Sequence, residues 1–173
     1  VTSDFGCVGS VTIPAVVHPK PVSDFATQNV CLNDVMDFLD QSSVSVGNVV
    51  SWEWDFGDTN TDNVASPSHT YGAFGNFTVE QIVETNNGCR DTSTQVVEVY
   101  QLPVADFNFA NVCLEDDAVF TDASTTNSGT VDTWLWDLGD NTTDNVQGPI
   151  VHAYPAPGTY TVELIVASDL GCW

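Results

Sequence analysis

The sequence predicts an all-β protein made of tandem seven-stranded β-sandwiches. Three observations support this fold class: segments recur with a period of about 82 residues, apolar and polar side chains alternate in short runs, and turn-forming dipeptides separate these runs. No stretch shows the helical periodicity of about 3.6. Short strands at regular spacing within about 82 residues are typical of a seven-stranded sandwich.

The repeat is visible in three segments that return in the same order. Each returns at a constant offset: 21–25 as 103–107, 29–32 as 111–114, and 52–58 as 134–140. One inserted residue then lengthens the offset by one, so that His69-Thr70-Tyr71 returns as His152-Ala153-Tyr154. We therefore expect one sandwich over residues 21–102 and a second over residues 103–173.

The N-terminal segment belongs to the same pattern. Gly6-Cys7 lies one full period before Gly88-Cys89, which predicts that residues 1–20 are the last strand of a preceding repeat. The second sandwich lacks its final strand, so a neighbouring chain or further residues must supply it, because an open sheet edge invites association. The chain is interpreted as a segment of a longer array.

Two runs illustrate the strand pattern. Trp52, Trp54 and Phe56 alternate with smaller or charged residues, and residues 77–84 alternate in the same way. Such aromatic rows usually fill the core of a sandwich, although an exposed row could bind sugars. We expect Trp54 and Trp136 in the two cores.

The combined motifs resemble those of PKD (polycystic kidney disease) domains. The resemblance rests on Trp54-Asp55-Phe56-Gly57-Asp58, on the His-Thr-Tyr segment at 69–71, on Gly75-Asn76-Phe77-Thr78-Val79, and on their second copies. It departs mildly at Leu138 and Phe77, where the family usually has Phe and Tyr. The resemblance implies an immunoglobulin-like sandwich of the kind found in surface layers, adhesins and secreted hydrolases. Tandem copies with cysteines resemble the large secreted surface proteins of Bacteroidetes.

The charge balance restricts the partners. The chain has 24 acidic residues against Lys20 and Arg90, which gives a net charge of −22. Such a surface repels nucleic acids and anionic membranes. No apolar run is long enough to span a bilayer, so the sequence predicts no membrane insertion.

Acidic turns recur in both repeats and raise the question of calcium. Closely spaced oxygen ligands suit this ion, but Asp also stabilises turns by accepting backbone N–H groups. The spacing is not that of an EF-hand loop. Calcium is the only cofactor that the sequence suggests, and its candidate ligands are Asp55, Asp58, Asp62, Asp137, Asp140 and Asp144.

The sequence predicts no catalytic site and no enzyme. His69 and His152 occupy equivalent positions, and a structural hydrogen bond to a nearby carbonyl or carboxylate suits them better than catalysis. No nucleophile motif or phosphate loop is present. Asn76 and Asn141 begin sequons for N-glycosylation.

Five cysteines, at positions 7, 31, 89, 113 and 172, recur with the repeat and predict disulfides in an extracellular setting. Pairing within each repeat would give Cys31–Cys89 and Cys113–Cys172. In an immunoglobulin-like sandwich, however, the cysteine before the second strand and the one in the last hairpin lie at opposite ends. We therefore prefer an inter-repeat bridge between Cys31 and Cys172, because a disulfide tolerates a Cα separation of only about 6 Å.

These observations predict a structural or adhesive segment, a stalk or filament, of a large extracellular surface protein. Its partners would be neighbouring repeats of the same chain, further copies in self-assembled fibres, and a surface or glycan ligand that the sequence does not identify. The alternative is an accessory substrate-binding module of a secreted hydrolase.

Overall fold

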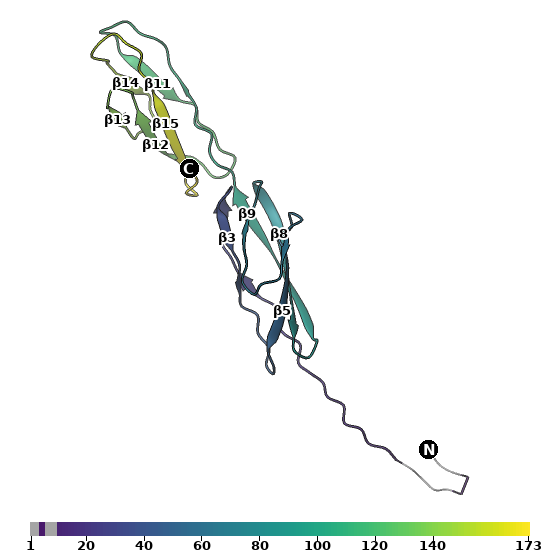
Figure 1. Cartoon of the computed structure of the whole chain (residues 1–173). Coiled ribbons are helices and arrows are strands. Elements are labelled where there is room, and N and C mark those ends of the chain that lie inside the picture. Colours follow the sequence, from purple (N-terminus) through teal and green to yellow (C-terminus); the bar gives the residue numbers. More distant parts are fainter. Residues whose placement is uncertain (1–3, 6–9) are drawn as a thin grey trace.

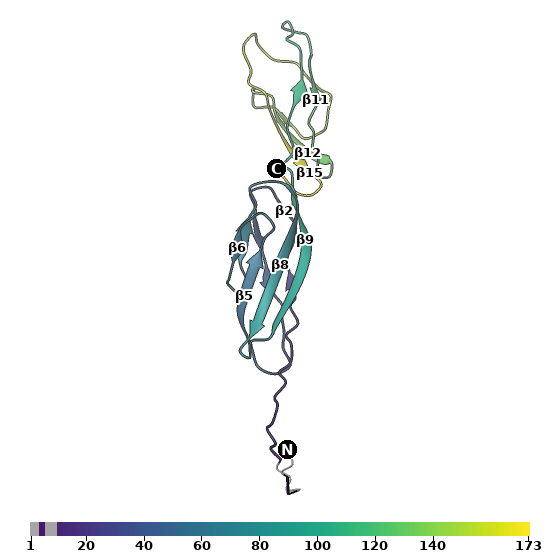
Figure 2. The same ribbon diagram turned by 90° about the vertical axis from the view of Figure 1, so that its right-hand side faces the viewer.

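The computed structural model describes residues 4–5 and 10–173 and contains two elongated β-sandwiches placed end to end (Figures 1 and 2). All regular elements among these residues are strands, so the predicted all-β fold class is confirmed. The part of the chain that is described also has no helix of the length and apolarity needed to cross a membrane.

The first sandwich contains nine short or long strands: β1 (Phe25–Ala26), β2 (Val30–Cys31), β3 (Val35–Asp37), β4 (Leu39–Asp40), β5 (Val49–Asp55), β6 (Thr61–Asp62), β7 (Ser68–Thr70), β8 (Gly75–Thr85) and β9 (Arg90–Tyr100). One face is a five-stranded sheet in the order β2-β9-β8-β5-β6. The other consists of the pairs β1-β4 and β3-β7.

The second sandwich contains β10 (Phe107–Asn108), β11 (Ala118–Asp122), β12 (Val131–Asp137), β13 (Thr143–Asp144), β14 (Ile150–His152) and β15 (Glu163–Ser168). Its sheets have the orders β10-β11-β14 and β13-β12-β15. The strand β15 corresponds to β8 but has 6 residues instead of 11. The second copy is therefore shorter in the strand that, in the first copy, pairs with β9.

Aromatic side chains form the two cores, as expected for Trp54 and Trp136, which are 2% and 1% exposed. The Trp54 indole donates a hydrogen bond to the Val64 carbonyl at 2.9 Å. Trp136 makes the equivalent bond to Val146 at 3.0 Å. Each indole thereby buries its ring while keeping its N–H satisfied.

The turn after each tryptophan strand requires glycine. Gly57 has φ +77°, and a Cβ on it would lie 2.5 Å from the carbonyl oxygen of Thr78. Gly139 has φ +82° and an equivalent approach of 2.4 Å to the Thr161 oxygen. These positions explain why the Gly-Asp pair of the motif returns in both repeats.

The expected strand over residues 1–20 is described only in part. Residues 10–20 belong to no sheet and lead away from the first sandwich as an extended segment (Figure 1). Residues 1–3 and 6–9 lie outside the described residues. At the base of the segment, the Lys20 ammonium donates a hydrogen bond to Asp91 at 2.5 Å.

Candidate functional site at the junction of the two sandwiches

A disulfide between Cys31 and Cys172 crosses the junction of the sandwiches. The two Cα atoms lie 5.6 Å apart, although the cysteines are 141 positions apart in sequence. Cys172 is 1% exposed and Cys31 is 9% exposed. The bridge is therefore sheltered from solvent and joins the end of one domain to the end of the next.

The chain presents Cys31 at the junction through a short parallel pairing. The strand β2 lies beside the end of β9, with Cys31 opposite Tyr100. The carbonyl of Tyr100 accepts the Leu32 N–H at 2.9 Å, and the Asp34 N–H closes a turn on the Cys31 carbonyl at 3.0 Å. Because Tyr100 is the last residue of β9, Cys31 lies where the chain leaves the first sandwich.

Cys172 is presented by a turn that follows β15. The Gly171 N–H bonds the Ser168 carbonyl, and the Ser168 N–H bonds the Cys172 carbonyl, each at 2.9 Å. Gly171 has φ +82°, a conformation that suits glycine. The hairpin thus points its cysteine toward the first sandwich.

Polar contacts of the linker add to the bridge. The Gln101 N–H donates to the Ser128 hydroxyl at 2.9 Å, and the Asn127 amide donates to the Gln101 side-chain oxygen at 2.8 Å. Sequence reasoning missed these three residues, because their side chains do not recur at the repeat period: Val46 stands at the position equivalent to Ser128.

The alternative pairing within each repeat is wrong for this structure. Cys89 directly precedes β9 and Cys31 pairs with the end of that strand, so the two lie about 35 Å apart at the rise of an extended chain. Cys89 and Cys113 are free thiols. Cys7 lies outside the described residues.

The candidate calcium ligands act as turn residues. Asp55 and Asp137 accept the N–H groups of Gly57 and Gly139 at 2.8 and 2.9 Å. Asp62 accepts the N–H groups of Asn63 and Val64. Among residues 4–5 and 10–173, no three acidic, His or Cys side chains converge in the manner of a metal site. The structure therefore gives these aspartates backbone donors, and calcium binding stays a prediction.

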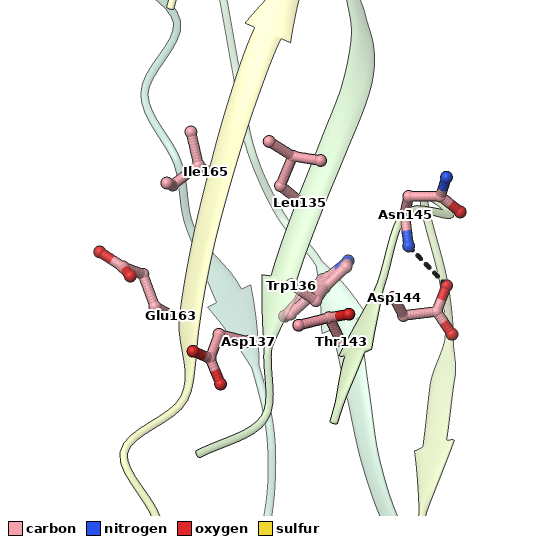
Figure 3. Close-up of a pocket in the computed structure, with 8 residues that line it drawn as sticks. All are labelled: Leu135, Trp136, Asp137, Thr143, Asp144, Asn145, Glu163 and Ile165. Carbon is pink, nitrogen blue, oxygen red and sulfur yellow. Dashed lines mark hydrogen bonds between the residues drawn. The ribbon is translucent and has the colours of Figure 1, made fainter. Parts of the chain in front are cut away.

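Asp137 and Asp144 of the second sandwich lie beside a shallow surface hollow, which Figure 3 shows. It is an open depression of about 600 Å³ along β12, β13 and β15, with Asp137, Asp144 and Glu163 at its walls. Asp144 Oδ1 accepts the Asn145 N–H at 2.7 Å, which is the dashed contact in Figure 3. An equivalent hollow lies along β5, β6 and β8 of the first sandwich.

Asp58 and Asp140 accept the backbone N–H groups of Asn60 and Thr142 and also bond histidines. Asp58 lies 2.7 Å from His69 Nε2, and Asp140 lies 2.8 Å from His152 Nε2. Burial alone would raise the pKa of Asp58, but hydrogen bonds from His69 and Asn60 outweigh it and hold the pKa below its ordinary value. The hydrogen bond from His152 lowers the pKa of Asp140. Both histidines thus have carboxylate partners.

The remaining sequence candidates lie on the surface or in the core. Asn76 and Asn141 are exposed, on β8 and in the turn after β12 respectively. Trp52 and Trp134 pack partly buried against the cores, so neither forms an open sugar-binding face. N-glycosylation at the two asparagines stays a prediction.

The fold and the bridge define a tandem β-sandwich with a covalently joined junction. The sequence model of the PKD domain family, "PKD domain", matches residues 17–99 and 100–173. The chain therefore belongs to the PKD domain family. PKD domains are non-catalytic modules, and the two matches account for residues 17–173.

Similar proteins include proteases. The pre-pro-metalloprotease PrtV of Vibrio cholerae is 31% identical over 134 residues, which is 75% of this chain and 14% of that protein. Collagenase ColA of Bacillus cereus is 40% identical over 57 residues, 33% of this chain and 6% of that protein. The chain thus spans only a small part of the relatives it matches.

One solved PKD domain is similar to part of this chain. The crystal structure of the PKD1 domain of Vibrio anguillarum Epp has 28% sequence identity and a TM-score of 0.46, and the match covers 48% of this chain and 96% of that one.

Proposed function

We propose that the chain is a non-catalytic structural spacer in the stalk of an extracellular surface protein. The observation that carries this proposal is the Cys31–Cys172 bridge, which joins two domains instead of stabilising one. A bridge of this kind opposes bending and separation of neighbouring domains. Disulfides persist in oxidising environments, which supports an extracellular location.

The bridge also supports a mechanical role because of where it lies in the chain. Tension applied at the two ends passes from residue 31 directly to residue 172 and bypasses the whole segment between them. Most of both sandwiches therefore lies outside the covalent path of the force. This arrangement suits a segment that must keep its length under load.

Small-angle X-ray scattering tests the spacer proposal on the whole chain. The oxidised protein should scatter as an extended particle of defined maximum dimension, whereas Cys172→Ser should broaden the distance distribution as the junction begins to bend. Cys89→Ser is the matched control and should leave the curve unchanged. Identical curves for the wild type and Cys172→Ser would contradict the proposal.

A second candidate is an accessory module beside a catalytic domain, favoured by the similarity to a metalloprotease and to collagenases. In that case the chain would bind a protein or glycan substrate. Calorimetric titration with triple-helical collagen peptide and with polysaccharides tests it, and saturable binding would favour the module over the spacer.

A further inference from the structure

The strands β8 and β15 turn nearly the same set of side chains toward their cores. Gln81 lies opposite Trp54 in the first sandwich. Leu164 lies opposite Trp136 in the second, so the two positions are equivalent. The inward positions correspond as Phe77 with Tyr160, Val79 with Val162, Gln81 with Leu164, Val83 with Val166, and Thr85 with Ser168. Only the pair of Gln81 and Leu164 replaces a polar amide by an aliphatic side chain.

A second difference between the repeats lies at a position that Gln81 contacts. Residues 21–25 and 103–107 are identical except that Ala105 stands in place of Ser23. The Ser23 hydroxyl donates a hydrogen bond to Gln81 Oε1 at 2.8 Å. The repeats therefore differ together at two positions that touch in the first sandwich. The first repeat has Ser with Gln, and the second has Ala with Leu.

Gln81 is the centre of a buried polar network in the first sandwich. Its side chain has no exposed surface. Its Nε2 donates to Asp40 Oδ1 at 2.7 Å, and its Oε1 also accepts the Ser42 hydroxyl at 3.2 Å. Asp40 belongs to β4 and Gln81 to β8, which lie in different sheets. The amide therefore joins the two layers of the sandwich through its own hydrogen bonds.

The surroundings of this amide are the same in both repeats. Asp40 accepts the Ser42 N–H at 3.1 Å, and Asp122 accepts the Ser124 N–H at 3.0 Å. The second sandwich keeps this turn although Leu164 lies in its core with 7% of its surface exposed. An apolar residue at this position is therefore compatible with the fold. The polar pair of the first repeat must serve something other than the fold itself.

Exchange of strands between neighbouring repeats would disrupt these pairs. Similar neighbouring domains can assemble with each other's segments while they fold. In the first sandwich, Leu164 of β15 would remove the acceptor of the Ser23 hydroxyl and the donor to Asp40. In the second sandwich, Gln81 of β8 would lie buried where Ala105 offers no hydrogen bond. Since a buried polar group that loses its partner costs the free energy of its desolvation, both exchanged arrangements are less stable than the native one.

We propose that Ser23–Gln81 and Ala105–Leu164 are matched pairs that keep the strands of each repeat in their own sandwich. The tryptophans and valines do not distinguish β8 from β15, because both repeats have them at the same positions. A single buried polar residue selects between otherwise equal partners in the same way in coiled coils. This inference does not depend on the spacer proposal, because it concerns how the sandwiches assemble and not how they bear load.

Interrupted refolding of the whole chain from urea tests the proposal. The background carries Cys7→Ser, Cys89→Ser and Cys113→Ser, so that no free thiol can rearrange the Cys31–Cys172 bridge. A prolyl isomerase is present, which shortens the slow phases that come from proline. After each delay, a jump back to urea counts the molecules that have become native. The measured quantity is the fraction that still refolds slowly, which includes the molecules with exchanged strands.

Two variants separate the matching of the pairs from their polarity. Ser23→Ala with Gln81→Leu gives both repeats the same apolar pair, and the slow fraction should rise at least about threefold. The matched control adds Ala105→Ser and Leu164→Gln, which exchanges the pairs between the repeats and keeps them different. Its slow fraction should stay close to that of the wild type. Equal slow fractions in the wild type and the double variant, or an equal rise in both variants, would overturn the proposal.

Equilibrium unfolding in urea tests the matching in the folded state. Gln81→Leu alone should lower the urea midpoint, because the Ser23 hydroxyl and Asp40 lose a partner. The addition of Ser23→Ala should recover part of this loss. Leu164→Gln alone should likewise lower the midpoint, and Ala105→Ser should recover part of it. Simple addition of the losses in both double variants would show that the residues are not matched and would contradict the proposal.

Discussion

Removal of the Cys31–Cys172 bridge should destabilise both sandwiches and not one alone. Since Cys31 lies beside Tyr100 at the exit of the first sandwich, unfolding of the second sandwich alone leaves residues 102–172 as a closed loop. Unfolding of the first sandwich alone likewise leaves a loop of similar length that the disulfide keeps closed. For a loop of about 70 residues, the loss of chain entropy corresponds to about 4 kcal/mol in either case.

The assay is hydrogen exchange read by mass spectrometry, with peptides from each sandwich followed separately, for the wild type and Cys172→Ser. We expect protection to fall in both sandwiches and both thermal midpoints to drop by roughly 10–20 °C, given about 2–4 kcal/mol for domains of this size. Cys89→Ser controls for loss of a thiol. Loss of protection confined to one sandwich would refute the reasoning, because a bridge that stabilises a single domain gives that result.

Three further predictions concern the turns and their carboxylates. Gly57→Ala should lower the free energy of unfolding, measured in urea, by about 2 kcal/mol or more, because its Cβ would lie 2.5 Å from the Thr78 oxygen and its φ is +77°. Gly72→Ala is the control: a Cβ there would have no atom within 4 Å, so the change should stay within about 0.5 kcal/mol. Equal effects of the two substitutions would contradict this reasoning. The lowered pKa values of Asp58 and Asp140 contribute stability that is present above the ordinary carboxyl pKa and is lost as pH falls through the folded-state value. The thermal midpoint should therefore decrease as the pH is lowered from about 4. Asp58→Asn should make this dependence of the thermal midpoint on pH less steep. Because the acidic turns already bind backbone N–H groups, a chelator should leave the thermal midpoint unchanged, and a rise of several degrees with millimolar calcium would show a metal site.

The sequence predicted the period, the strand pattern and the aromatic cores because these follow from local alternation and recurrence. The Cys31–Cys172 disulfide could also be predicted, because it depends on which end of a sandwich each cysteine occupies. The sequence alone left the pairing within each repeat open as the alternative. Spacing alone does not distinguish the two pairings, because Cys31 and Cys89 recur with the same period.

Other features depend on contacts that have no periodic signal. The bonds of Gln101 with Ser128 and Asn127 arise only when the linker docks on the second sandwich. The strand β15 begins later than the alternation predicts, since Val162 and Leu164 continue the pattern of β8 although Val162 lies outside the strand. The aspartates suit metal ligation and turn formation alike, because carboxylates serve both roles. Their backbone partners show the turn role, and calcium binding stays a prediction.

Single-molecule force spectroscopy on the whole chain, pulled from its two ends, tests the central claim most directly. With the bridge intact, the residues between Cys31 and Cys172 should contribute no length as the sandwiches are loaded. Reduction should release a further contour length of about 480 Å, from roughly 3.4 Å per residue. Release of that length before reduction would contradict the account.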